Sequence, residues 1–412
     1  MIILRAIIPA LFFCLLLLGI DAYSSNAIQN IFAQYFPNLG TFPLTFWKAS
    51  SWFFLVSFVL ILAVAGSNKN SRPISRLIIP LILFIIIPKL IFSSFLLLED
   101  LSRYAEAAWH RYTMGGWHLP FRHNTFGLVA LLLSIYPPLL LLYGIFNKYK
   151  YRYFRYNIKI DNLPEELKGL KVVQFSDAHL GSLNRPKKVM KGIEMINKEK
   201  PDLIFFTGDL VNNLANETDK FTECLSALKC KHGIFSILGN HDYADYYYFS
   251  NKEDKLKNIQ SLIHKQESYG WRVLMDENEI LKIGNSLISI VGIQNWSALP
   301  QFTKYGNLPK AYVGSEKGDL QLLLSHDPTH WDAEVRKNFP NIDVMFAGHT
   351  HGMQFGFEAF GFKISPSQLM FKQWAGLYQE GKQYLLVNRG FGVVGYPGRI
   401  GIMPEISVVT FE

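Results

Sequence analysis

The sequence predicts an α/β domain that follows an α-helical membrane region. Three observations support this division. Long apolar runs are concentrated in the first 150 of the 412 residues. Short β-branched and aromatic runs alternate with helical stretches from about residue 158 onward. Five short polar motifs, each beside an apolar run, are confined to that second part. We therefore expect a transmembrane region at 1–150 and an α/β domain at 151–412.

Four apolar runs are long enough to cross a bilayer, which takes about 20 residues. They are Ile2–Ile20, Trp47–Ala65, Leu77–Leu98 and Phe126–Phe146. The first run has an alternative interpretation as a cleaved signal peptide, because Arg5 precedes a long apolar stretch. Lys89 lies inside the third run, where its side chain either extends to the membrane surface or faces the helix bundle.

Charge is divided as unequally as hydrophobicity. Residues 1–156 hold 13 Lys and Arg against 4 Asp and Glu, whereas the remainder has a net charge of −1. With the N-terminus inside, eight basic residues lie on the inner side of the predicted spans and four on the outer side. Because cytoplasmic loops are enriched in Lys and Arg, we expect a multi-pass protein whose α/β domain faces the cytoplasm. The lipid bilayer is an expected partner, and the near-neutral second part argues against nucleic acid.

The second part predicts a layered α/β fold. Eight segments are expected to be strands: Leu170–Phe175, Leu203–Thr207, Ile234–Leu238, Ser286–Gly292, Leu320–Leu324, Val344–Ala347, Tyr384–Asn388 and Ile406–Phe411. Helices are expected at Lys187–Lys198, Asp219–Leu228 and Lys255–Tyr269. Alternation of this kind implies buried, largely parallel strands, whose carboxyl ends form the usual ligand site. The aromatic and basic segment Asn147–Tyr156 suits a membrane-surface anchor, a first strand, or both.

The polar motifs contain the oxygen and nitrogen groups that divalent metals bind. Asp177 and His179 are two residues apart and can hold one metal, and Asp209 follows an expected strand, where a carboxylate can bridge two cations. Gly208-Asp209 is equally an ordinary turn sequence. Asn240 offers a carboxamide oxygen to a metal.

Histidines dominate the remaining motif positions. His241 can reach a leaving-group oxygen, and Asp242 beside it either orients that imidazole or caps a following helix. His326, His349 and His351 end two further strands. No cysteine takes part, which indicates Mn, Fe, Zn or Co and argues against a structural zinc site.

The order Asp-x-His, Gly-Asp, Gly-Asn-His-Asp, His and Gly-His-Thr-His resembles the calcineurin-like metallophosphoesterase superfamily over roughly residues 155–412. The stretches Phe175–Gly181 and Val387–Val393 are similar to its bacterial membrane-anchored members of the YaeI/YkuE type. The resemblance implies a four-layer αββα sandwich, two divalent metal ions and a location in the bacterial inner membrane. It assigns the first metal to Asp177, His179, Asp209 and His351, and the second to Asp209, Asn240, His326 and His349.

The resemblance also implies an activity. Hydroxide formed on the two metals would attack a phosphodiester or pyrophosphate bond, with His241 as the acid. A lipid-linked substrate such as UDP-diacylglucosamine is one candidate that the resemblance supplies. The alternatives are a soluble nucleotide or cyclic nucleotide phosphodiesterase located at the membrane, and a membrane signalling or scaffold protein with a vestigial metal site.

Two features bear on the substrate. Arg389 and Arg399 lie in a glycine-rich stretch, where they either grip a second phosphate or are solvated loop cations. The aromatic segments Met353–Lys363 and Leu369–Trp374 follow the last histidine motif. They are expected either to pack under the sheet, the interpretation we favour from sequence, or to form an apolar wall for acyl chains.

Overall fold

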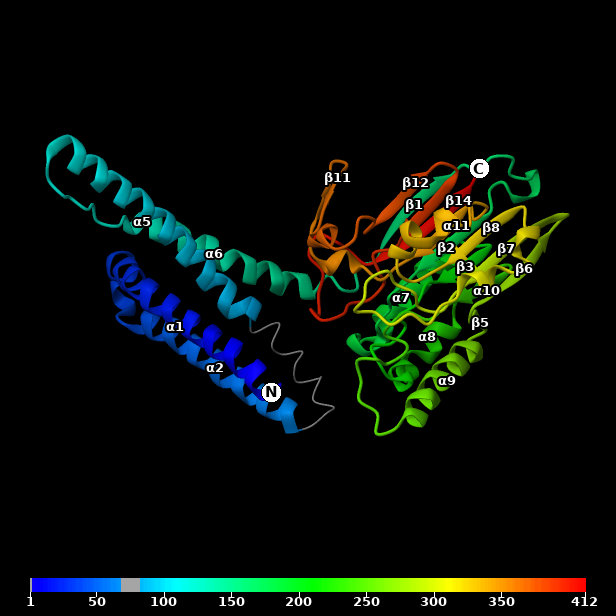
Figure 1. Cartoon of the computed structure of the whole chain (residues 1–412), viewed down its shortest axis with the longest axis horizontal. Coiled ribbons are helices and arrows are strands. Elements are labelled where there is room, and N and C mark those ends of the chain that lie inside the picture. Colours follow the sequence, from blue (N-terminus) through cyan, green and yellow to red (C-terminus); the bar gives the residue numbers. More distant parts are fainter. Residues whose placement is uncertain (1, 68–81) are drawn as a thin grey trace. The chain divides into compact units, whose positions relative to one another are not determined.

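The computed structural model describes residues 2–67 and 82–412 and divides the chain into two compact units, Met1–Leu142 and Tyr143–Glu412. Helices make up the first unit: α1 (Ile2–Tyr35), α2 (Phe42–Ser67), α5 (Ile87–Met114), which continues a π-helical turn at Ile82–Ile86, and α6 (Asn124–Ile145), most of which lies in this unit (Figure 1). Helices α1, α2 and α6 consist mainly of apolar residues, whereas the C-terminal half of α5 carries charged residues.

Two helices of the described chain are long and apolar enough to span a membrane. These candidate spans are Phe42–Leu60 and Asn124–Ile145, which overlap two of the four expected spans. The expected span Ile2–Ile20 falls within α1, and the expected span Leu77–Leu98 begins outside the described residues. The total of four spans therefore stays a prediction.

Lys89 faces the interior of the helical unit. Its ammonium group is buried 2.6 Å from Asp21 Oδ1, and it donates to Ser51 Oγ at 2.7 Å and to the carbonyl oxygen of Trp47 at 2.5 Å. All three N–H donors are thereby satisfied, which is the condition for keeping a lysine in an apolar helix bundle. The structure therefore shows Lys89 facing the helix bundle and not extending to the membrane surface.

Two six-stranded sheets form the second unit. The first contains, in spatial order, β1 (Arg152–Ile158), β14 (Glu405–Phe411), β2 (Lys171–Phe175), β3 (Leu203–Phe206), β4 (Gly233–Ser236) and β5 (Trp271–Val273). The second contains β12 (Gly376–Glu380), β13 (Gln383–Val387), β9 (Val344–Ala347), β8 (Leu320–Leu324), β7 (Ser286–Gly292) and β6 (Glu277–Ile283). Strands β2 to β5 are parallel, and so are β7, β8, β9 and β13. The expected α/β fold is confirmed.

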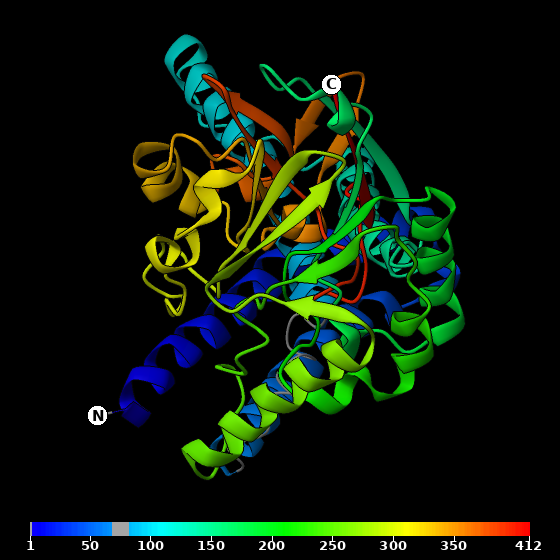
Figure 2. The same cartoon turned by 90° about the vertical axis from the view of Figure 1, so that its right-hand side faces the viewer.

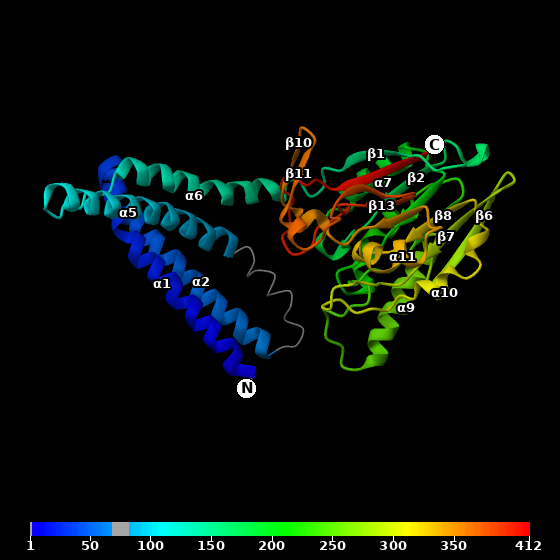
Figure 3. The same cartoon turned by 45° about the horizontal axis from the view of Figure 1, so that its top comes forward.

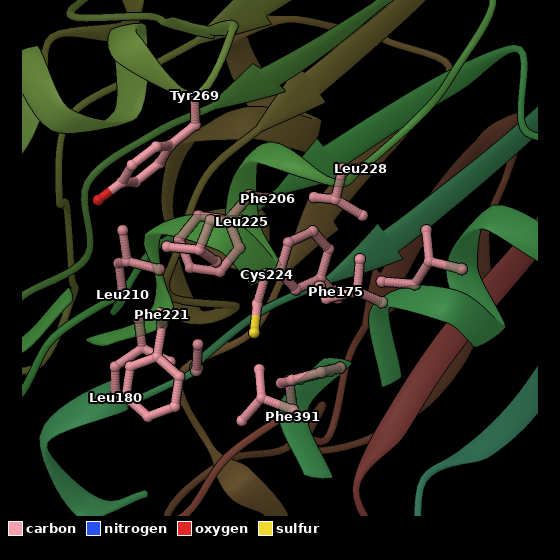
Figure 4. Close-up of a cluster of buried hydrophobic side chains, with 14 of the residues drawn as sticks. Phe175, Leu180, Phe206, Leu210, Phe221, Cys224, Leu225, Leu228, Tyr269 and Phe391 are labelled. Atoms are coloured by element: carbon pink, nitrogen blue, oxygen red, sulfur yellow. The ribbon is translucent and has the colours of Figure 1, made fainter. Parts of the chain in front are cut away.

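The sheets and helices form four layers. Apolar side chains from both sheets, among them Phe205 and Phe346, meet in a fully buried core. A second cluster lies between the first sheet and helices α7 (Pro186–Lys198), α8 (Thr222–Ser226) and α9 (Lys252–Ser268) (Figure 4). A third lies between the second sheet and α10 (Leu308–Tyr312) with the π-turn Trp331–Val335. Figure 2 shows these two helical groups on opposite sides of the strands.

The helix α7 illustrates why these layers form. Val189, Ile193 and Ile196 recur at helical spacing and are buried on one face of α7, which packs on the first sheet. Pro186 occupies the first turn, where a missing N–H costs no hydrogen bond.

Several details differ from the sequence expectations. The segment expected as a helix at Asp219–Leu228 is a 3₁₀ helix at Ala215–Phe221 followed by the short α8. Strands β5, β6 and β12 were not expected. The segment Asn147–Tyr156 leads into β1, which agrees with its interpretation as a first strand. After β9, the hairpin β10 (Phe357–Ala359) and β11 (Phe362–Ile364) projects beyond both sheets (Figures 1 and 3).

Candidate active site

The residues expected to bind metal converge at one edge of the sandwich. They follow the carboxyl ends of β2, β3 and β4 in the first sheet and of β8 and β9 in the second. Because both sheets direct these ends to the same edge, segments distant in sequence meet there. Short interatomic distances link six of these residues, and the seventh lines the same cavity: Asp177, His179, Asp209, Asn240, His326, His349 and His351.

The backbone of these loops is strained. Five of the seven residues have positive φ angles although none is glycine: Asp177, His179, Asp209, His349 and His351. Such conformations are uncommon and cluster at functional sites. The neighbouring Gly348 has no room for a side chain, because a Cβ atom there would collide with Ser176 Oγ and the Asp177 carboxylate. Backbone strain and close approach together hold the side chains in one place.

The first group consists of Asp177, His179 and His351. His351 Nε2 lies 3.3 Å from Asp177 Oδ1 and 3.0 Å from His179 Nε2. His179 Nδ1 donates to the side-chain oxygen of Asn212 at 3.1 Å, which leaves its Nε2 as a lone-pair donor facing the group. Two nitrogens 3.0 Å apart are close enough for both to bind one cation at the usual metal–nitrogen distance of about 2.1 Å.

The second group consists of Asp209, His326, His349 and Asn240. His326 Nδ1 donates to the carbonyl oxygen of Thr207 at 2.7 Å, so its Nε2 is the nitrogen that faces Asp209 Oδ2, 3.2 Å away. Within the described chain, His326 Nε2, His349 Nδ1 and Asn240 Oδ1 are buried without a hydrogen-bond partner. Buried polar atoms normally have partners. A cation at this place would supply the partner that these three atoms lack, and it would replace the proton that His326 shares with Asp209.

The electrostatics favour cation binding. Burial lowers the pKa of His179, His349 and His351, which keeps these imidazoles neutral and their lone pairs available. Burial opposes ionisation of Asp209, yet the neighbouring His326 and His241 hold its pKa well below the usual range. Against its own burial, the charge of Asp209 raises the pKa of His326 to about 10. The carboxylate that attracts this proton also attracts a metal ion.

His241 borders the same cavity and is half-buried. Its Nδ1 donates to the carbonyl oxygen of Asn212 at 2.9 Å, and its ring packs edge-on against His179 with centroids 4.7 Å apart. The hydrogen bond fixes the ring orientation and leaves Nε2 to act on a bound molecule.

Asp242 neither orients the His241 imidazole nor caps a following helix. Its buried carboxylate accepts the backbone N–H groups of Asp209, Leu210, Val211 and Gly239 at 2.8 to 3.2 Å. The expectation that it orients His241 is corrected, because His241 is held by Asn212, and no described helix follows directly for it to cap. Burial and the charge of Asp209 raise the pKa of Asp242 to about 7. Asp242 joins the two metal-site turns.

Arg389 and Arg399 are not solvated loop cations. Arg389 is buried between Glu405, 2.6 Å away, and Glu358, 2.5 Å away. The guanidinium of Arg399 is fully buried and donates to the carbonyl oxygens of Gly390 and Gly392. It also lies 3.3 Å from His351 Nδ1. The expected grip on a second phosphate is corrected, because both groups are buried and bonded to protein atoms.

A cavity of about 200 Å³ opens over the candidate metal ligands. Its remaining wall is apolar and includes Phe302, Met353, Met370, Phe371 and Val394. The aromatic segments Met353–Lys363 and Leu369–Trp374 therefore contain both buried and exposed side chains. The expectation that we favoured from sequence, packing under the sheet, does not hold for the exposed ones. Phe371 and Trp374 are buried, whereas Phe360 is 94% and Leu369 85% exposed.

Two further residues of the site were given no role from the sequence. Asn212 orients both His179 and His241, through its side chain and its backbone carbonyl group. Asp327 lies 3.5 Å from His349 Nε2, on the side opposite the unpartnered Nδ1. Asn212 follows the Gly208-Asp209 motif by three residues, and Asp327 is the last residue of the motif Ser325-His326-Asp327. Their closeness in the chain to the candidate ligands Asp209 and His326 is the one feature of the sequence that indicated a place in the site.

Comparison with known families agrees with this geometry. Residues 170–353 match the family described as calcineurin-like phosphoesterase. The second unit therefore contains a calcineurin-like phosphoesterase domain. Enzymes of this phosphoesterase family use divalent metals. Residues 4–148 match a second family, described as "Probable Calcineurin-like phosphoesterase, transmembrane domain". The protein is thus a membrane-associated metallophosphoesterase.

Relatives in several organisms share the phosphoesterase domain. The metallophosphoesterase YkuE of Bacillus subtilis is 29% identical over 265 residues, which cover 62% of this chain and 84% of YkuE. A Danio rerio protein, named transmembrane protein with metallophosphoesterase domain, is 27% identical over 62% of this chain and 56% of its own length. The solved structure of a dimetal phosphatase from Danio rerio has 11% identity and a TM-score of 0.35, and covers 60% of this chain and 100% of its own.

Proposed function

We propose that this chain is a multi-pass membrane enzyme that hydrolyses a phosphodiester or pyrophosphate bond with two divalent metal ions. The observation that carries the proposal is the set of buried side-chain atoms of His326, His349 and Asn240 that lack a hydrogen-bond partner, with Asp209 beside His326. Asp177, His179 and His351 would hold the first ion, with Asp209 shared between the two. This sharing is supported by the two cation-sized groups to which Asp209 contributes, one with His179 and His241 and one with His326 and His349.

The metal ions would supply a nucleophile at neutral pH and neutralise charge on the phosphoryl group. The protein contributes the arrangement of ligands and one proton donor. His241 is the residue proposed to protonate the leaving oxygen, because its free Nε2 borders the cavity while Nδ1 is held by a carbonyl oxygen. Asp242 supports the reaction indirectly, by fixing the turn that carries Asp209.

A lipid-linked substrate fits the surroundings of the site. Apolar side chains form one wall of the cavity, and the same segment continues into the hairpin β10–β11. Exposed apolar residues concentrate there: Met353, Phe355, Phe357, Phe360, Phe362, Ile364, Leu369 and Met370. Large exposed apolar patches normally mark a binding surface. We propose that acyl chains or the bilayer surface contact this patch while the phosphoester group enters the cavity.

The topology that we propose has four spans, with the transmembrane region at 1–150 and the phosphoesterase domain at 151–412 in the cytoplasm. The excess of basic residues on the inner side of the predicted spans supports this orientation. Labelling with a membrane-impermeant maleimide tests it in a cysteine-free background. A cysteine at the exposed position of Phe121 should react from outside intact cells, and one at the exposed position of Leu369 should not.

The first experiment measures Mn²⁺-dependent release of p-nitrophenol from bis(p-nitrophenyl) phosphate by the full-length protein in detergent. An Asn240→Ala variant should lose turnover, because the second metal would lose an oxygen ligand. Turnover that survives in this variant contradicts the assignment. A protein that binds metal yet does not hydrolyse this ester or a lipid phosphoester supports a scaffold role instead.

A second experiment tests the lipid proposal. The variant Phe360→Ser/Leu369→Ser should hydrolyse a lipid pyrophosphate in vesicles at least about tenfold more slowly, because two large apolar contacts are lost. Its rate with bis(p-nitrophenyl) phosphate should match the wild type. Val313→Ser is the control, since Val313 is 74% exposed outside the patch. Equal losses with both substrates, or none with the lipid, would favour the soluble nucleotide alternative.

A further inference from the structure

The helical unit contains a polar cavity that the phosphoesterase chemistry does not use. It measures about 380 Å³ and lies between α1, α5 and the beginning of α6. Polar and charged side chains from all three segments line it, including Asn26, Asn30, Glu99, Arg103, Arg122 and His123. Every one of these residues lies within Met1–Leu142. The cavity is partly open, because Asn26, Asn30 and His123 are exposed whereas Glu99 is buried.

Glu99 is the residue that points to a ligand. Glu99 is buried, with a relative exposure of 7%. Oε1 accepts the backbone N–H group of His123 at 2.6 Å, at the beginning of α6. Oε2 has no hydrogen-bond partner among the described residues, and Glu99 lines the cavity. One carboxylate oxygen therefore supports the fold, and the other needs a donor that the described residues do not provide.

Positive charge is in excess near Glu99, because two arginines, Arg103 and Arg122, share the single carboxylate of Asp100. Arg103 Nη1 lies 2.5 Å from Asp100 Oδ1, and Arg122 Nε lies 2.8 Å from the same oxygen. Asp100 also accepts the hydroxyl group of Tyr23 at 2.7 Å. One carboxylate thus faces two guanidinium groups, each of which has five N–H donors. The cavity has a net cationic edge at the arginines and a free anionic oxygen at Glu99.

We propose that this cavity binds a zwitterionic group that carries a phosphate and a primary ammonium, the headgroup of an aminophospholipid. The phosphate would accept from Arg103 and Arg122, and the ammonium would donate to Glu99 Oε2. The location supports a lipid source. The cavity adjoins the beginning of the candidate span Asn124–Ile145, and the ends of spans lie at the depth of lipid headgroups. A choline headgroup fits less well, because it has no N–H donor for Oε2.

The test is lipid binding to the full-length protein in detergent, measured by native mass spectrometry. We expect phosphatidylethanolamine to bind about tenfold or more tightly than phosphatidylcholine or phosphatidylglycerol. Glu99→Gln should remove this preference while keeping an oxygen for the His123 N–H group. Glu106→Gln is the matched control, because Glu106 is exposed on the same helix α5 and should retain the preference.

Three results would overturn the proposal. The first is an equal affinity of the wild-type protein for all three lipids. The second is a phosphatidylethanolamine preference that survives in Glu99→Gln. The third concerns the source of the headgroup: soluble phosphoethanolamine that displaces the lipid at comparable concentration would assign the cavity to a soluble ligand. Melting temperatures of both variants without added lipid show whether each is folded, and Glu99→Asp provides a second variant if Glu99→Gln is not.

Discussion

Replacement of Asp242 by alanine distinguishes a role in the metal-site scaffold from a role in the chemistry. The carboxylate accepts four buried backbone N–H groups, at 2.8, 2.8, 3.2 and 3.0 Å. Each donor left without an acceptor costs at least about 1 kcal/mol, so Asp242→Ala should destabilise the domain by about 4 kcal/mol. At roughly 2–4 °C per kcal/mol for a domain of this size, the melting temperature should fall by about 8–16 °C.

The assay combines thermal unfolding of the full-length protein in detergent with its metal content by mass spectrometry. Metal content should fall together with stability, because Asp209 is carried by the turn that Asp242 holds. Asp242→Asn, which keeps one acceptor oxygen, should lose less of both. Asp161→Ala is the control, since Asp161 is exposed and a surface change is worth within about 0.5 kcal/mol. Unchanged melting and metal content with lost turnover would refute this reasoning and restore a catalytic role.

Three further predictions follow from the contacts. His241→Ala should keep its bound metal and lose about 10²–10⁴ in kcat, as for removal of a general acid; a kcat within threefold of the wild type would contradict this role. Asp209→Ala should lose metal as well as turnover, measured by metal content, because the carboxylate is shared by two candidate groups. Lys89→Met should lower stability by about 3–5 kcal/mol by leaving Asp21 unpaired, and adding Asp21→Asn should restore much of it; a melting curve that the single change leaves unaltered would refute the pairing.

The candidate ligands were accessible to sequence reasoning because each is placed by a local rule. Asp209 and His349 directly follow glycines that lie one or two residues beyond short apolar strands, and the carboxyl ends of parallel strands meet at one edge. Strand β6 was missed for the converse reason. It is an edge strand whose side chains are mostly half-buried or exposed, so its apolar pattern is weak.

The sequence did not indicate which groups would form hydrogen bonds or ion pairs with Arg389, Arg399 and Asp242. Arg399 and Arg389 resembled substrate-binding cations until their contacts with backbone carbonyls and buried glutamates were visible. Asp242 stands beside His241 in the chain but bonds to residues about 30 positions earlier.

The chain order of carboxylate, carboxamide and imidazole groups was therefore enough to predict a metal site and its chemistry. Those groups can bind cations whatever fold the chain adopts, because their ligand atoms belong to the residue types themselves. The roles of their neighbours, the exposure of the hairpin β10–β11 and the polar cavity at Glu99 depend on long-range packing. Hydrogen bonds are satisfied by whatever lies near in space, and a one-dimensional pattern does not contain that information.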